Sequence, residues 1–373
     1  MTKKVGIITL HYAYNYGSVL QAYALQKVIN DWGYHANIIN YVDRHDFINY
    51  QLFRWQHYLT RPREIAADIV FLRKNLRRKQ AFRHFQEKYL HIHGRPVYKD
   101  EDMRELCNAF DYYITGSDQV WNFKVTGGVN PIYFLNFANH NAKKIAYAPS
   151  MGELDQTQTN LQAIEPLLRK FDHMSIREKS TKKRIEALYG RPVQVTVDPT
   201  LLLDSKNYAS LTEKILQPAP KDKYIFVYLL EPNNTLVDYV QKLAAEQGLL
   251  VIYISNIVKG NVFGNVTSNS EYGASPERFL QLIKNATFVV TNSFHATIFS
   301  ILFERQFVTF KTKKSFPRML DLLQTIGLED RVSGDTKTIS NQIDYSHVEE
   351  KLNIVRASSL EYLRSALDLE QTL

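Results

Sequence analysis

The alternation of apolar and polar residues predicts short strands separated by helices. Residues 4–10 and 36–41 are apolar runs with the composition of strands. Between them, apolar residues recur at helical spacing over residues 25–32, and Gly33 follows as a helix stop. A strand, a helix and a second strand in this order are the usual opening of a parallel, doubly wound sheet.

The same alternation continues and restarts after a proline-rich break. Further strands are predicted at residues 112–115, 144–148, 173–176 and 193–197. Gln217-Pro218-Ala219-Pro220 then indicates a linker. Beyond it, strands are predicted at 224–230, 249–254, 288–291 and 306–310, and helices at 236–247, at 275–283 and from His295 onward.

These elements predict an α/β protein with two Rossmann-like domains that face each other across a cleft. We expect the N-terminal domain to span residues 1–217, with a basic helical insert at about 45–90, and the second domain to span 218–345. By analogy with related folds, the last helical stretch, 346–373, is expected to pack back on the N-terminal domain.

Size and composition favour a soluble protein of two domains. The 373 residues exceed what one hydrophobic core usually serves, and 45% hydrophobic with 23% charged residues is ordinary for globular proteins. Cys107 is the only cysteine, so it is either a nucleophile or, more commonly, a packed side chain. The sequence shows neither a signal-peptide pattern nor an apolar run of about 20 residues, so we expect a cytoplasmic protein.

The formal charge of +8 is concentrated in one segment. Nine basic and three acidic residues between Arg61 and Lys88 give this segment a charge of +6, and apolar residues from Ile65 to Leu76 follow helical spacing. A solvated helix is one interpretation, and peripheral contact with an anionic membrane or a pyrophosphate-linked substrate is the other. Because no nucleic-acid-binding module accompanies the charge, a nucleic-acid partner is not expected.

Three polar loops follow predicted strands, at residues 11–18, 116–122 and 291–297. Ligands of open parallel sheets bind beyond the carboxyl ends of the strands, where helix N-termini offer free N–H groups. His295 begins a helix in the third loop, at a position that favours a neighbouring anion, and a capping role is the alternative. Arg177 either binds phosphate or carboxylate or pairs on the surface with Glu178 or Asp172.

The common nucleotide, zinc and serine-hydrolase signatures are absent, so the residues by themselves indicate a transferase-like enzyme that binds an anion. At the same loops, however, the chain resembles the polysaccharide pyruvyl transferase family. The matching stretches run in order from about residue 4 to residue 331, and they are Asn15-Tyr-Gly-Ser-Val-Leu-Gln-Ala-Tyr-Ala-Leu25, Gly116-Ser-Asp-Gln-Val-Trp-Asn122, Ser175-Ile-Arg-Glu178, Val197-Asp-Pro-Thr200 and Val290-Thr-Asn-Ser-Phe-His295.

The resemblance implies a glycosyltransferase-B-like fold and transfer of pyruvate from phosphoenolpyruvate to a sugar as a cyclic ketal. The acceptor would be a sugar of a cell-surface glycan or of its lipid-linked precursor. No cofactor beyond the co-substrate phosphoenolpyruvate is implied, and the chemistry requires no metal. Two rival functions are a glycosyltransferase that uses a nucleotide sugar and a noncatalytic glycan-binding protein.

The family's phosphoenolpyruvate site falls on Arg177 and His295. Ser293 stands where some members carry an arginine, and a hydroxyl and backbone N–H groups at a helix start still suit phosphate. Asn292 completes the donor-side prediction. His295 is the expected catalytic acid, because a group that titrates near neutrality suits proton transfer to the methylene carbon.

The resemblance places the acceptor in the N-terminal half, at Asn15, Gly17 and Gln21. Asp118 is either the base toward the acceptor hydroxyl or a turn cap with Ser117. Trp121 is predicted to stack on a sugar, with core packing as the alternative. Simple loop roles for the first three residues also stay open, although Gly17 would permit a tight turn.

Overall fold

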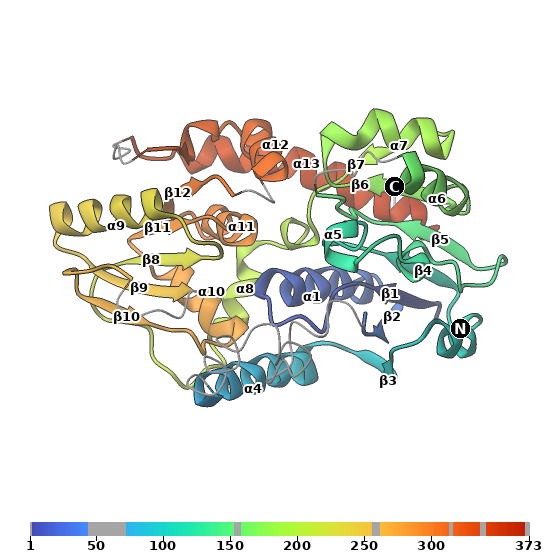
Figure 1. The fold of residues 1–373 in the computed structure, drawn as a ribbon, viewed down its shortest axis with the longest axis horizontal. Helices are drawn as coiled ribbons and strands as arrows, with labels where there is room; N and C mark the ends of the chain where they lie inside the picture. Colours follow the sequence, from blue (N-terminus) through green and yellow to red (C-terminus); the bar gives the residue numbers. More distant parts are fainter. Residues whose placement is uncertain are drawn as a thin grey trace. The chain divides into compact units, whose positions relative to one another are not determined.

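The computed structural model of the chain describes residues 2–43, 72–152, 158–255, 262–312, 316–335 and 341–369. The chain divides into two compact units (Figure 1). Unit 1 comprises residues 1–76, 83–202 and 354–373, and unit 2 comprises residues 77–82 and 203–353. Each unit is built around its own parallel sheet.

Unit 1 contains a seven-stranded parallel sheet in the order β3-β2-β1-β4-β5-β6-β7. Its strands are β1 (Lys4–Ile8), β2 (His35–Tyr41), β3 (Ile92–Val97), β4 (Tyr112–Thr115), β5 (Lys143–Ala146), β6 (His173–Ile176) and β7 (Gln194–Val195). The central strands are almost entirely buried, as expected for a parallel sheet covered on both faces.

Unit 2 contains a six-stranded parallel sheet in the order β10-β9-β8-β11-β12-β13. Its strands are β8 (Tyr224–Leu229), β9 (Leu250–Ser255), β10 (Ser268–Ser270), β11 (Phe288–Thr291), β12 (Gln306–Phe310) and β13 (Val332–Ser333). Chain order therefore reverses between β1 and β4 in unit 1 and between β8 and β11 in unit 2. These two positions are the switch points at which doubly wound sheets bind ligands.

Helices connect the strands in both units. Those of unit 1 are α1 (Tyr16–Asp31), α5 (Phe123–Thr126), α6 (Gln158–Leu168), α7 (Lys182–Tyr189) and the 3-10 helices η3 (Asp100–Leu106), η4 (Pro131–Phe134), η5 (Lys179–Thr181) and η6 (Pro199–Leu201). Those of unit 2 are α8 (Ser205–Thr212), α9 (Asn234–Gln247), α10 (Pro276–Lys284), α11 (Phe294–Leu302), α12 (Phe316–Ile326) and η7 (Glu329–Arg331). Residues of α4 (Leu72–Tyr89) and α13 (Tyr345–Ala366) are divided between the two units.

The main segment of unit 2 begins at Leu203, before the segment 217–220 that was expected to link the domains. The reason lies in α8, where the ring of Tyr208 packs edge-on against Phe299 of α11 at 4.9 Å. At the other end of the chain, residues from Ile354 onward belong to unit 1. There the Tyr362 hydroxyl donates to the Ala146 carbonyl at 2.9 Å, which fixes the end of α13 to β5.

Much of the predicted basic insert lies at residues 44–71, outside the described residues. In the described part, α4 exposes Arg73, Lys74 and Arg77, whereas the Arg78 guanidinium lies 5.3 Å from the Tyr272 ring centroid within unit 2. Arg78 is therefore a packed residue and not part of a uniformly basic outer face. Among the helices that the structure describes, none has the length and apolar character needed to cross a bilayer.

Candidate functional site

The loop after β4 occupies the switch point of unit 1. Gly116 adopts a φ of 108°, and a Cβ atom there would lie only 2.2 Å from the Tyr147 carbonyl oxygen, so glycine is required. The next carbonyl, that of Ser117, accepts a hydrogen bond of 3.0 Å from the Thr9 hydroxyl at the end of β1. Gln21 in turn donates to that hydroxyl at 2.8 Å. The ends of β1 and β4 are thus joined through buried polar groups.

Asp118 lies at the same switch point in a left-handed backbone conformation, with a φ of 70°. Its carboxylate accepts hydrogen bonds from the Ser18 hydroxyl at 2.5 Å and from the Gln119 amide at 2.9 Å. The Ser117 hydroxyl donates instead to the Ala148 carbonyl, at 2.7 Å. Asp118 is therefore fixed by the first turn of α1, which leaves its proposed role as a base untested.

Arg177 follows β6 and forms a buried ion pair with Asp198. The guanidinium and the carboxylate lie 2.6 Å apart, and the two side chains are 3% and 0% exposed. Arg177 also donates to the Ser117 hydroxyl. The suggested surface pair with Glu178 or Asp172 is therefore wrong, and the guanidinium connects the loops that follow β4, β6 and β7.

The charges of this ion pair also affect the pKa of a neighbouring residue, Tyr147. Burial, with the Asp198 carboxylate as the next cause, raises the pKa of Tyr147 well above its ordinary value. The Tyr147 hydroxyl donates to the Val197 carbonyl at 3.1 Å. Tyr147 is thus a neutral hydrogen-bond donor that holds the chain beside Asp198.

Two of the predicted acceptor residues form the start of α1. The Asn15 side chain caps this helix by accepting a hydrogen bond of 2.9 Å from the Gly17 amide. Gly17 lies in the first helical turn, which corrects the expectation of a separate tight turn. The predicted contact of Asn15 and Gly17 with an acceptor stays a prediction.

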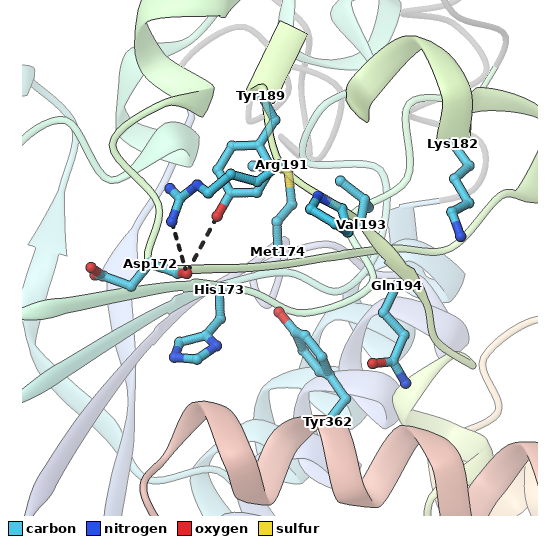
Figure 2. Close-up of a pocket in the computed structure, with 10 residues that line it drawn as sticks. Asp172, His173, Met174, Lys182, Tyr189, Arg191, Val193, Gln194 and Tyr362 are labelled. Carbon is cyan, nitrogen blue, oxygen red and sulfur yellow. Dashed lines mark hydrogen bonds between the residues drawn. The ribbon is translucent and has the colours of Figure 1, made fainter. Parts of the chain in front are cut away.

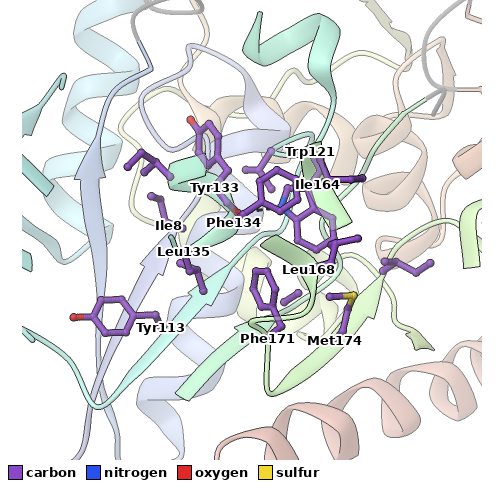
Figure 3. Close-up of a cluster of buried hydrophobic side chains, with 14 of the residues drawn as sticks. Ile8, Tyr113, Trp121, Tyr133, Phe134, Leu135, Ile164, Leu168, Phe171 and Met174 are labelled. Atoms are coloured by element: carbon purple, nitrogen blue, oxygen red, sulfur yellow. Dashed lines mark hydrogen bonds between the residues drawn. The ribbon is translucent and has the colours of Figure 1, made fainter. Parts of the chain in front are cut away.

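Trp121 is a core residue of unit 1, which corrects its predicted role in sugar stacking. It is 1% exposed, and its ring stacks on Phe134 at 4.9 Å and meets Phe171 edge-on at 5.7 Å (Figure 3). Its indole N–H donates to the Tyr133 carbonyl at 2.9 Å. Both the rings and the polar atom of Trp121 are used in packing, as expected for a buried tryptophan.

In unit 2, the switch point is formed by the turn between β11 and α11. Asn292 is 1% exposed, and its side chain accepts from the Leu230 amide at 2.8 Å and donates to the Glu231 carbonyl at 2.9 Å. Asn292 therefore connects the ends of β8 and β11. This geometry supports a positioning role for the Asn292 side chain.

Ser293 is the N-cap of α11. Its hydroxyl accepts a long hydrogen bond of 3.4 Å from the Ala296 amide, and its own amide donates to the Thr291 hydroxyl at 3.0 Å. His295 follows in the first turn and is 7% exposed. The sequence therefore located correctly the helix start on which His295 lies.

A cationic residue that sequence reasoning missed also lies at this helix start. The Arg318 guanidinium, from α12, is 5.1 Å from the ring centroid of Phe294, and Arg318 is 8% exposed. Arg318 is hard to predict as a site residue from the sequence, because it follows neither a strand nor a recognised motif. Asp198 and Ser18 were likewise not chosen, although both belong to stretches that carry the family resemblance. Within the described residues, no group of three or more His, Cys, Asp or Glu side chains is arranged to hold a metal ion.

Solved structures with similar folds cover nearly the whole chain. UDP-N-acetylglucosamine 2-epimerase from Rickettsia bellii is 12% identical with a TM-score of 0.51, covering 99% of this chain and 100% of its own. The Methanocaldococcus jannaschii UDP-GlcNAc 2-epimerase in complex with UDP-GlcNAc and UDP is 10% identical with a TM-score of 0.51, again covering 99% and 100%. An alpha-glucosyltransferase in complex with UDP and a 13-mer DNA is 11% identical with a TM-score of 0.50, covering 98% and 95%.

These likenesses, together with two Rossmann-ordered sheets, define a glycosyltransferase-B-like fold. The sequence profile described as polysaccharide pyruvyl transferase matches residues 15–314. The chain therefore belongs to the polysaccharide pyruvyl transferase family, and it is a transferase that modifies polysaccharides. A search of curated proteins found no match.

Proposed function

We propose that the protein transfers pyruvate from phosphoenolpyruvate to two hydroxyl groups of a glycan sugar or of its lipid-linked precursor. The observation that carries this proposal is the family match over residues 15–314, which includes the switch points of both sheets. The acidic and basic candidates, His295 and Asp118, lie at these two switch points. Ligand binding at the switch points of doubly wound sheets supports this assignment.

The reaction balances with two acceptor hydroxyls and one phosphoenolpyruvate. The first hydroxyl oxygen bonds to the enol carbon while its proton passes to a base, and the methylene carbon takes a proton from an acid to become a methyl group. The second hydroxyl oxygen then bonds to the same carbon, the bond to the phosphate oxygen breaks, and the second hydroxyl proton leaves with the phosphate. The products are a cyclic ketal and inorganic phosphate.

In this proposal His295 supplies the proton to the methylene carbon, and the start of α11 receives an anionic group of the donor. The N–H groups at the start of α11 and the Arg318 guanidinium near Phe294 both favour an anion. Asp118 takes the proton of the acceptor hydroxyl. The hydrogen bond from Ser18 fixes the Asp118 carboxylate at the switch point, as a positioned base requires.

Arg177 has two roles in the proposal, and the structure supports them unequally. Its bonds to Asp198 and Ser117 support the positioning of the loop that carries Asp118. A direct contact with the donor would require the 3% exposed side chain to become accessible. We therefore propose loop positioning as its first role and keep donor binding as the second.

The effect of added ligand on the melting temperature tests whether phosphoenolpyruvate is the donor. A ligand that binds only the folded protein raises the melting temperature. We expect phosphoenolpyruvate to raise the melting temperature of the wild type, and to do so much less in His295→Ala. The matched control is His347→Ala, because the His347 side chain of unit 2 is 64% exposed.

The same melting-temperature measurement with UDP tests the rival function. Stabilisation by UDP at similar concentrations, with none by phosphoenolpyruvate, would instead support a glycosyltransferase that uses a nucleotide sugar. Equal responses of wild type and His295→Ala to phosphoenolpyruvate would remove His295 from the donor site.

A further inference from the structure

A pocket lies in unit 1 at the end of the sheet opposite the switch point. It surrounds the amino end of β6, whereas Arg177 follows the carboxyl end of the same strand. Its volume of about 490 Å³ lies within the range of small-molecule sites. Neither the family resemblance nor the proposed reaction assigns a function to this pocket.

The walls of the pocket come from four elements of unit 1 (Figure 2). The described wall includes His173 from β6, Lys182 and Tyr189 from α7, Gln194 from β7 and Tyr362 from α13. The aromatic rings and nearby aliphatic residues supply an apolar surface, and the remaining side chains supply nitrogen donors. This combination is typical of a site for a polar small molecule.

Arg191 is held in a fixed orientation at the pocket wall. Its guanidinium lies 4.2 Å from the ring centroid of Tyr189 and donates to the carbonyls of Phe171 and, at 3.5 Å, Asp172. The Tyr189 hydroxyl donates to the same two carbonyls at 2.9 and 3.3 Å. Stacking and these hydrogen bonds reduce the entropy that the guanidinium would lose on binding a ligand.

The acidic groups near the pocket, Asp172 and Glu186, both have partners. The Asp172 carboxylate accepts a hydrogen bond of 2.8 Å from the Lys144 amide and points away from the labelled lining side chains in Figure 2. Lys182 has only a loose ion pair of 3.7 Å with Glu186. Of the residues that line the pocket, Lys182 and Arg191 carry positive charge and Asp172 carries negative charge.

His173 adds a titratable group. Within the part of the chain that the structure describes, the His173 ring makes no hydrogen bond, so its nitrogens are available to a ligand. Burial and then the Lys143 charge lower the His173 pKa, Arg191 acts in the same direction, and Asp172 and Asp368 oppose them. An anion near the imidazole would raise that pKa.

We propose that this pocket binds a phosphate dianion, either inorganic phosphate or the phosphate group of a small monoester. Lys182 and Arg191 provide the charge, and His173 donates a hydrogen bond once protonated. The inference concerns a different end of the sheet from the pyruvyl-transfer site and does not depend on the proposed function. A phosphate site here would be connected to Arg177 through β6 and also through β7, which runs from Gln194 at the pocket toward Asp198.

The test follows the titration of His173 by NMR in the full-length protein labelled at histidine, with His173→Gln assigning the signal. Inorganic phosphate and glycerol 3-phosphate are compared with chloride at equal ionic strength. We expect either phosphate compound to raise the His173 titration midpoint by about half a unit or more, since an opposite charge within hydrogen-bonding distance shifts a pKa by that order. The compound that acts at the lower concentration identifies the source of the phosphate group.

Two variants of α7 provide the matched comparison. Lys182→Glu, at the pocket, should abolish the shift, and Lys183→Glu, the neighbouring residue outside the pocket wall, should retain it. Lys182 is partly exposed, so this change leaves the Arg191 contacts and the core intact. No shift with either phosphate compound, or an equal shift in both variants, would overturn the proposal. His295→Ala should retain the shift, which separates this test from that of pyruvyl transfer.

Discussion

Arg177 and Asp198 form an ion pair of 2.6 Å whose side chains are almost completely buried. Asp198 also accepts hydrogen bonds from the Thr200 amide at 2.9 Å and the Thr200 hydroxyl at 2.6 Å. Because Arg177 additionally donates to Ser117, this pair joins the loop after β7 to the loop that carries Asp118. The pair is thus a structural element of the site at the switch point.

Asp198→Asn should strongly destabilise the protein, because it leaves the Arg177 charge buried without its carboxylate partner. We expect a loss of about 3–5 kcal/mol in the free energy of unfolding, measured by urea denaturation. The control is Asp31→Asn, which breaks the exposed pair of Lys27 and Asp31 and should cost less than about 1 kcal/mol. Similar small losses in both variants would show that the buried pair contributes little.

Trp121 should affect stability and not acceptor affinity. Trp121→Ala removes a 1% exposed side chain from the core and should cost about 3–5 kcal/mol in the free energy of unfolding. Trp121→Phe keeps most of the packing, so the KM for the acceptor should stay at the wild-type value. An increase in that KM without a loss of stability would restore Trp121 to the acceptor site.

His11 should make the protein less stable in acid. Burial is the largest influence on the pKa of His11 and lowers it, although hydrogen bonds with Thr9 and Asn40 oppose this effect. With the folded pKa below the unfolded value of about 6.5, the His11 contribution is complete above that pH. It is lost as the pH falls through the folded pKa, because the unfolded chain binds the proton more readily.

The melting temperature measures this effect. Between about pH 7.5 and pH 5.5, on either side of the ordinary histidine pKa, it should fall less in His11→Gln than in the wild type. His35→Gln, at an exposed position, should keep the wild-type dependence. An equal fall in the wild type and His11→Gln would remove His11 as the cause.

Asp118 and Ser18 should differ in their effects on catalysis. Asp118→Asn removes the proposed base and should lower kcat by roughly 10²- to 10⁴-fold. Ser18→Ala removes only the 2.5 Å hydrogen bond to that carboxylate, so its effect on kcat should be smaller. Steady-state kinetics with saturating donor measures both. If Ser18→Ala were as damaging as Asp118→Asn, the pair would act as a unit and Asp118 alone would not be the base.

The central strands could be predicted from sequence because each is a continuous apolar run. β4, β6, β11 and β12 have the predicted bounds. The edge strands β3 and β10 were missed for a physical reason. β3 is mostly exposed and contains glycine and proline, and β10 consists of Ser268, Asn269 and Ser270, so neither has a hydrophobic pattern.

The candidate site could be predicted only where its residues are neighbours in the chain. Asn292, Ser293 and His295 were found together because one strand leads directly into one helix. The partnership of Ser18 with Asp118 spans 100 residues and depends on β1 lying beside β4. Sequence spacing carries no such information, so the partners of Asp118 and Arg177 required the structure.

Turnover with labelled phosphoenolpyruvate tests pyruvyl transfer most directly. The purified protein is incubated with donor carrying ¹³C at its methylene carbon and with a panel of free and lipid-linked sugars. The proposal predicts a ¹³C-labelled methyl ketal and inorganic phosphate in equal amounts, with kcat roughly 10²- to 10⁴-fold lower in His295→Ala and unchanged in His347→Ala. Transfer of a sugar from a nucleotide sugar to the same acceptors, without incorporation of the label, would contradict it.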